Sequence, residues 1–108
     1  MLDSLAWFIL DATADDWESI DQILPHVHVC YGSVEARIVA STLVRLARDG
    51  LLRVAQTVEA GDMTDLETGS IDIEGIIENP SEFWFCMTPR GRILWDSEGR
   101  KYLDEPAH

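Results

Sequence analysis

The chain has 108 residues, of which 20 are acidic and 8 are basic, so its formal net charge at pH 7 is −12. This length predicts a single domain, and an apolar fraction of 46% is typical of a globular protein. The charge disfavours binding to nucleic-acid phosphates and acidic lipid surfaces, and no apolar run approaches the roughly 20 residues that a membrane-spanning helix needs.

Residues 2–12 are predicted to form the first helix, with Asp3 or Ser4 at its start. The run from Leu5 to Leu10 is almost continuously apolar, and at helical spacing such a run covers most of the helix circumference. A helix of this kind has to be buried nearly all round. We therefore expect it either at the centre of the domain or covered by a second chain.

Residues 17–24 are predicted to form a second helix, capped by Asp15 or Asp16. Pro25 is expected to end it, because the residue before a proline is disfavoured in a helix. Residues 26–32 alternate in character and are predicted to be a short extended connection.

The clearest helix covers residues 33–49, with Ser33 as its predicted N-cap. Its apolar residues recur at steps of three and four, which places them on one stripe: Val34, Ile38, Val39, Leu43 and Leu46. Gly50 is predicted to terminate the helix in the left-handed conformation that favours glycine. We expect the other elements to pack on this helix.

Two strands are predicted next, at residues 51–58 and 82–87, joined by a long acidic segment at residues 59–81. Several isoleucines in this segment either dock it on the domain or leave it mobile. A final helix is predicted at residues 89–102, with Thr88 as its N-cap.

Two stretches of sequence resemble the winged helix-turn-helix superfamily. LVRLARDGLLRV is similar to the end of a recognition helix that runs into the first wing strand, and FWFCMTPRGRILW to the second wing strand and the head of a C-terminal helix. MarR-like and PadR-like regulators have similar junctions. The resemblance implies an α+β winged-helix fold over residues 1–108: a three-helix core, a wing formed by a two- or three-stranded β-hairpin, and a C-terminal helix.

Two features depart from the pattern of this superfamily. The connection from Pro25 to Gly32 is longer than the turn of about three or four residues in a helix-turn-helix. The wing segment at residues 59–81 is acidic, whereas family members that bind DNA usually carry arginine or lysine there.

The resemblance implies DNA binding through the exposed face of helix 33–49. The candidate nucleic-acid-binding residues on that face are Ser33, Arg37, Ser41, Arg45 and Arg48. Arg37 is suited to reading a guanine edge, because arginine makes a two-pronged contact with O6 and N7. The alternative is that these arginines form a solvated face paired with Glu35 and Asp49.

The charge of the wing segment favours a different function. From Glu59 to Glu82 the chain carries eight carboxylates: Glu59, Asp62, Asp65, Glu67, Asp72, Glu74, Glu78 and Glu82. A wing lies along the DNA backbone, where these carboxylates would oppose binding. We therefore expect a non-enzymatic regulatory module that binds a protein partner, with the acidic wing facing a basic partner or imitating nucleic acid. A transcriptional regulator that binds DNA is the alternative, and a merely solvated acidic loop is the simplest interpretation of the segment.

Neither a metal, a cofactor nor a catalytic site is predicted. On an extended segment His26, His28 and Cys30 would share one side, but their spacing matches no zinc pattern. The acids around Asp65 lack the spacing of a calcium-binding EF-hand, and no phosphate loop or nucleophile elbow is present. The two cysteines are too few for a disulfide framework, and no secretory signal is apparent, so we expect a cytoplasmic protein.

The four tryptophans divide into two predicted groups. Trp17 and Trp84 are expected in the core. Trp7 and Trp95 lie in the first and last helices, which in dimers of the MarR and PadR kind often form the subunit interface. We therefore predict a homodimer whose interface uses Trp7, Leu10, Leu94 and Trp95.

Overall fold

A computed structural model describes residues 2–57, 63–67 and 71–99. In this part of the chain, five α-helices and a four-stranded antiparallel sheet form an α+β fold. The elements in chain order are α1 (Ser4–Ala12), β1 (Glu18–Ser19), α2 (Ile20–Tyr31), α3 (Ala36–Arg48), β2 (Leu52–Thr57), β3 (Met63–Leu66), α4 (Ile73–Glu78), β4 (Phe83–Met87), α5 (Pro89–Leu94) and the π-helical turn η3 (Trp95–Gly99).

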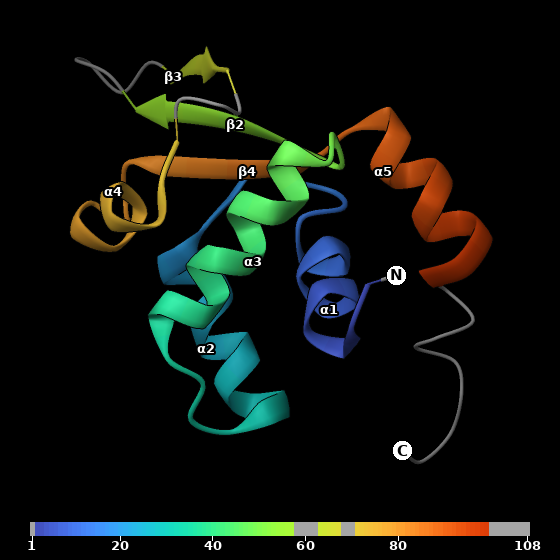
Figure 1. The fold of residues 1–108 in the computed structure, drawn as a ribbon, viewed down its shortest axis with the longest axis horizontal. Coiled ribbons are helices and arrows are strands. Elements are labelled where there is room, and N and C mark those ends of the chain that lie inside the picture. The colour runs from blue at the N-terminus through green and yellow to red at the C-terminus, as the bar shows by residue number, and fades with distance from the viewer. Residues whose placement is uncertain (1, 58–62, 68–70, 100–108) are drawn as a thin grey trace.

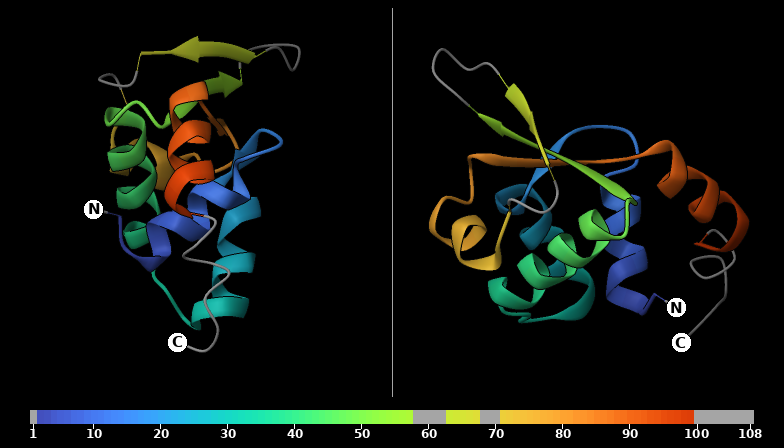
Figure 2. Two further views of the ribbon diagram at one scale, coloured as in Figure 1. Left: turned by 90° about the vertical axis from the view of Figure 1, so that its right-hand side faces the viewer. Right: turned by 45° about the horizontal axis from the view of Figure 1, so that its top comes forward.

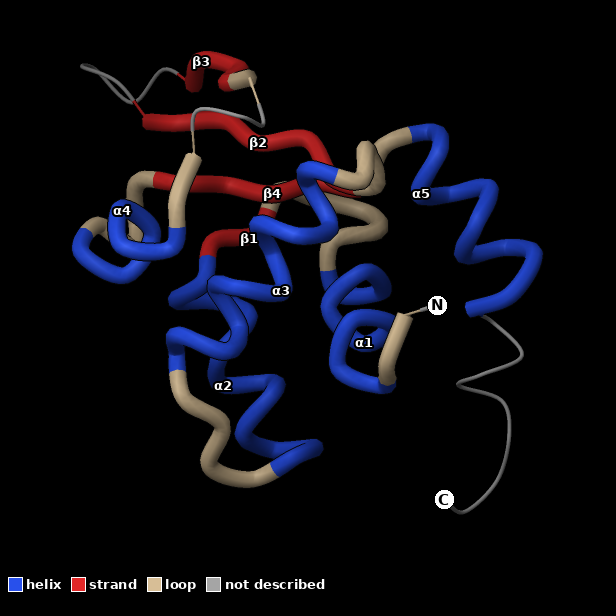
Figure 3. The backbone as a smooth tube through the Cα atoms, in the orientation of Figure 1, coloured by secondary structure: helices blue, strands red, loops and turns tan. Residues whose placement is uncertain are grey.

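The strands follow the order β1-β4-β2-β3, so strands distant in sequence lie next to each other. Strand β4 pairs with β1 on one side and with β2 on the other, and β3 extends the sheet beyond β2. Phe85 of β4 lies opposite Val54 of β2, and both side chains are fully buried on the face that packs on the helices. Figure 3 shows the strands gathered on one side of the molecule and helices α1 and α2 on the other.

The helices are arranged around α3. Helix α3 packs on α1, α2, α4 and strand β2, and in Figure 1 it lies between α4 and α1, with α5 beyond α1. Helices α4 and α5 flank opposite ends of β4 (Figure 1). Figure 2 shows the β2–β3 ribbon at the edge of the molecule farthest from α2.

Helix α1 confirms the prediction for the first helix. The side chain of Asp3 caps it by accepting a hydrogen bond from the amide of Ala6 at 2.9 Å. Ala6, Ile9 and Leu10 are completely buried. The same chain supplies this burial, because α1 packs on α2, α3 and η3. Of the two arrangements expected for this helix, the structure therefore shows burial within its own domain.

The prediction for the second helix is wrong at both ends. Residues 18–19 form strand β1, and α2 continues through Pro25 to Tyr31, where an extended connection was expected. The missing amide of Pro25 removes a bond to the Asp21 carbonyl, which lies on an exposed turn that water reaches. Ile23 and Val27, on either side of Pro25, are buried in the core. Their packing outweighs the local preference of proline.

The third helix exists as predicted but begins later. Its N-cap is Glu35, which makes no side-chain capping bond, so the assignment of Ser33 as the cap is wrong. Gly50 follows the helix with a φ of 79°, as expected for a left-handed C-terminal glycine. The amide of Leu51 donates to the carbonyl of Leu46 across this turn at 3.0 Å.

The acidic segment contains more structure than predicted. It includes β3 and helix α4, neither of which was expected. Ile71 and Ile76 are buried in the core, so the isoleucines dock the segment on the domain. The expected strands correspond to β2 and β4, and residues 58–62 and 68–70 lie outside the described chain.

The last helix starts as predicted, with Pro89 at its first position and Thr88 as its cap. The Thr88 hydroxyl accepts from the amide of Gly91 at 3.0 Å and donates to the carbonyl of Gly50 at 2.7 Å. After Leu94 the helix widens into η3, and residues 100–102 of the predicted helix lie outside the described chain. Of the helices that the structure describes, none has the length and apolar character needed to cross a membrane.

Candidate interaction face of helix α3

The exposed residues of α3 form one stripe. Arg37, Ser41, Arg45 and Arg48 follow each other at steps of four, four and three, and all are exposed. Such spacing keeps side chains on one side of a helix. The rest of the helix surface is largely buried, through Val39, Ala40, Leu43, Val44, Leu46 and Ala47. The structure therefore brings together four of the five residues predicted for this face, whereas Ser33 is exposed in the turn before the helix.

Arg37 is paired with a residue of the acidic segment. Its guanidinium lies 2.6 Å from Glu74 of α4, and both side chains are more than half exposed. The hydrogen bond from Arg37 and its positive charge hold the pKa of the Glu74 carboxyl below its usual value. An exposed pair of this kind adds little to stability, but it neutralises the charge of Arg37.

Arg45 is paired with the first helix instead. Its guanidinium lies 3.8 Å from the Asp3 carboxylate that also caps α1. Arg48, in the last turn of α3, forms no ion pair with any residue in the described part of the chain. The two carboxylates that meet the arginines are therefore not Glu35 and Asp49, the partners that the sequence suggested.

Helix α4 is the element of this face that the sequence reasoning missed. It packs on α3 and carries Asp72, Glu74 and Glu78 beside the stripe of arginines. Two signals in the sequence point to it. Asp72 has the position of an N-cap, and its side chain accepts from the amide of Gly75 at 2.6 Å. Ile73, Ile76 and Ile77 recur at helical steps after it.

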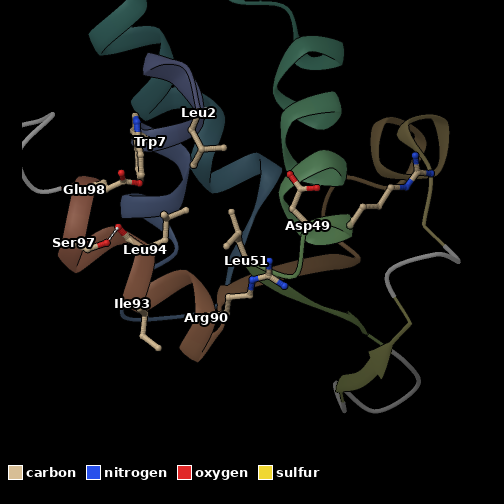
Figure 4. Close-up of a pocket in the computed structure, with 10 residues that line it drawn as sticks. Leu2, Trp7, Asp49, Leu51, Arg90, Ile93, Leu94, Ser97 and Glu98 are labelled. Atoms are coloured by element: carbon tan, nitrogen blue, oxygen red, sulfur yellow. Dashed lines mark hydrogen bonds between the residues drawn. The ribbon is translucent and has the colours of Figure 1, made fainter.

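A groove of about 820 Å³ opens next to the C-terminal end of α3. Figure 4 shows Leu2, Leu51 and Leu94 gathered between helices α1 and α5, with Arg90 and Asp49 on one side and Glu98 on the other. Its lining is thus an apolar floor with charges of both signs. These charges alone do not select one class of ligand.

The residues predicted for a dimer interface lie mainly inside the chain. Trp7 and Trp95 are buried against each other, with ring centroids 6.2 Å apart and planes at 50°. Leu10 is completely buried, and Leu94 is half-buried at the groove. Trp17 and Trp84, which were expected in the core, are instead half-buried. The expectation for these two tryptophans is therefore wrong.

The three candidate metal ligands are separated by the helix that contains them. His26 and Cys30 are four residues apart on α2 and line one hollow between α1 and α2. His28 projects elsewhere, and its Nε2 lies 2.9 Å from the carbonyl oxygen of Val34. No group of three metal-ligating side chains is brought together within the described residues. Asp62, one of the acids considered for calcium, lies outside them.

Comparison with known proteins adds no relative. No family model matches the chain, and no curated protein is significantly similar to it.

Proposed function

We propose that this chain is a winged helix-turn-helix domain. The connection between α2 and α3 consists of the four residues 32–35, which agrees with the usual helix-turn-helix length and removes the departure seen in the sequence. Gly32, in this turn, has φ 79° and ψ −154°, a conformation that is open essentially only to glycine. The pairing of the early strand β1 with β4, and of β4 with β2, further supports this arrangement. In it, the β2–β3 ribbon takes the place of the wing.

The domain works by binding a protein partner in the cytoplasm, without catalysis of its own. The observation that carries this proposal is the neutralisation of α3. Arg37 and Arg45 lie on the helix that would enter the major groove, and carboxylates from α4 and α1 hold both of them. Because the protein has a net charge of −12, it would repel duplex DNA at long range. At contact, the DNA would meet arginines that are already paired with carboxylates.

Wild-type protein is therefore expected to leave a labelled 30-base-pair duplex unbound, even at low salt. The measurement is a fluorescence-anisotropy titration at about 50 mM and about 200 mM salt, a range over which phosphate contacts lose most of their affinity. Arg37→Ala should not change this result. The double variant Asp3→Asn/Glu74→Gln serves as the control, because it releases both arginines and removes two negative charges.

Tight binding by the wild-type protein that weakens steeply with salt, and is lost in Arg37→Ala, would overturn the proposal in favour of DNA recognition. A pull-down from nuclease-treated extract of the cells that make the protein gives the complementary evidence. Protein retained after nuclease treatment supports the proposal, whereas capture that nuclease treatment abolishes contradicts it.

DNA binding is the second candidate function, and one observation favours it. Helix α3 contains no acidic residue, and its stripe of Arg37, Ser41, Arg45 and Arg48 has the composition of a groove-reading surface. Because the two ion pairs are exposed and weak, phosphate groups could exchange with their carboxylates.

A homodimer through the first and last helices is a further prediction. Since Trp7, Leu10 and Trp95 are buried within one chain, the contact would have to use Leu94 and its neighbour Ile93, which is 71% exposed. Sedimentation velocity at micromolar concentration should then show a dimer that Ile93→Glu converts to monomer. A monomeric wild-type protein would remove the homodimer from the proposal.

A further inference from the structure

The sheet has a second face, opposite the one that packs on the helices. Side chains alternate along a strand, and residues that lie directly opposite each other in an antiparallel pair share one face. Arg53 lies opposite Cys86, and Ala55 lies opposite Trp84. Their neighbours Val54 and Phe85 point into the core. Arg53, Ala55, Trp84 and Cys86, together with Trp17 beneath the guanidinium of Arg53, define what we name the tryptophan face.

Trp84 is held in a fixed position on this face. Its indole Nε1 donates to the Thr57 hydroxyl at 2.8 Å, and that hydroxyl donates in turn to the carbonyl of Glu82 at 3.1 Å. Ala55, opposite Trp84, is only 1% exposed, although its side chain is on the outer side of the sheet. The indole therefore presents part of its surface to solvent in a single orientation. Tryptophan is enriched among the residues that dominate binding at the centres of protein interfaces.

The face already holds one guanidinium group. The Arg53 side chain lies over the ring of Trp17, 5.3 Å from its centroid, and 2.9 Å from a carboxylate oxygen of Asp65 on β3. An aromatic surface combined with a carboxylate is the combination that recognises arginine, through cation–π attraction and a charged hydrogen bond. Arg53 thus demonstrates the chemistry that this surface accepts.

The surroundings of the face are acidic. Asp16 directly precedes Trp17, and its carboxylate accepts from the Trp17 amide at 2.8 Å. Burial raises the pKa of the Cys86 thiol, and the charge of Asp16 raises it further, while Arg53 opposes the rise. Asp16 and Asp65 therefore give the area a negative character that Arg53 balances only in part.

We propose that the tryptophan face is the docking surface for an arginine-bearing, basic segment of the protein partner. This inference rests on the proposed function and names the chemistry of the partner. Incoming guanidinium groups stack on Trp84 and Trp17 and pair with Asp16 and Asp65. Arg53 occupies one of these positions in the free protein, so it acts as an internal competitor.

The test uses a capped hexa-arginine peptide and the four indole N–H signals in the nitrogen–proton correlation spectrum. We expect the signals of Trp17 and Trp84 to shift on titration, and those of Trp7 and Trp95 to stay in place. Trp17→Ala should weaken the binding of hexa-arginine. Hexa-lysine should bind less tightly, because arginine is the better partner for an aromatic face.

Arg53→Gln gives the sharpest result, because it removes the competitor. It should tighten hexa-arginine binding by about three- to tenfold, the range expected for one cation–π contact. The matched control is Arg45→Gln, which removes the same charge from a similarly exposed pair on α3, away from the face. It should change the affinity by less than about twofold, since exposed charges at this distance are screened.

Three outcomes would overturn the inference: equal tightening by the two variants, peptide shifts that bypass Trp17 and Trp84, or shifts of these indoles by oligothymidine and not by hexa-arginine. The last result would identify the face as a stacking surface for single-stranded nucleic acid. If nuclease-treated extract yields a protein that wild type and Trp17→Ala capture equally, the inference is wrong while the proposed function stands. If capture occurs only in untreated extract and nuclease abolishes it, the proposed function itself fails.

Discussion

Replacing Gly91 with alanine is expected to destabilise the protein by about 3 kcal/mol or more, near the upper end for an overpacked site. Gly91 is buried in the first turn of α5. A Cβ atom there would clash with the carbonyl oxygen of Leu51 and lie 3.0 Å from Cγ of Met87. The backbone carbonyl cannot move away without displacing the turn between α3 and β2. Urea unfolding followed by circular dichroism measures the loss.

The sign of this effect distinguishes packing from helix propensity. Alanine is favoured over glycine in a helix by about 1 kcal/mol, so propensity alone predicts a more stable protein. Arg90→Ala, at an exposed position in the same helix, is the control and should change stability by less than about 0.5 kcal/mol. A stabilised Gly91→Ala variant would show that α5 does not approach Leu51 this closely.

Replacing Phe85 with alanine is expected to destabilise the protein by about 3–5 kcal/mol. Phe85 heads the fully buried side chains by volume, and it lies in β4, which pairs with both β1 and β2. Removal of its ring leaves a cavity where the sheet meets the helices. The free energy of unfolding, again measured in urea, tests this value.

Phe83→Ala is the matched control, since Phe83 lies two residues away on the same strand and is only half-buried. Its effect should be clearly smaller, because less apolar surface returns to water. Equal effects from the two substitutions would contradict the placement of the core beneath the centre of β4.

The strongest local signals in the sequence predicted three helix ends correctly. Asp3, Thr88 and Gly50 mark helix ends by their own chemistry, through a side-chain acceptor or a positive φ. Because these effects depend on only a few neighbouring residues, they could be predicted from the local sequence.

Pro25 shows where local reasoning fails. Proline usually ends a helix, yet α2 passes through it because Ile23 and Val27 are buried on the domain and Tyr31 bonds to Ser4 of α1. The stabilisation comes from another helix. The contact with α1 cannot be inferred from residues 17–32 alone, and the length of the turn before α3 was therefore misjudged.

The predictions for the burial of the tryptophans were wrong for a related reason. Trp7 is buried because the η3 turn places Trp95 and Gly99 against it, and Gly99 leaves no room for a side chain beside the two rings. Trp84 is half-buried because the outer side of the sheet has no covering helix in the described chain. Which aromatic residue is covered depends on the order of the strands, β1-β4-β2-β3, and this order joins residues distant in sequence.

The Arg37–Glu74 pair, on which the candidate interaction face depends, also joins distant parts of the chain. The sequence showed an arginine on α3 and an acidic segment without bases. It did not show that the segment folds back as α4 on the same helix. The buried side chains of Ile71 and Ile76 explain why it does.

Thr88 joins three parts of the backbone at one point. Its hydroxyl connects the carbonyl of Gly50 to the amide of Gly91, its own amide donates to Leu51, and the preceding amide of Met87 donates to Thr13. The end of α3 and the start of α5 are thereby coupled mechanically. Any displacement of the end of α3 relative to the start of α5 would therefore break hydrogen bonds at Thr88, so this single residue fixes the angle at which the two helices meet.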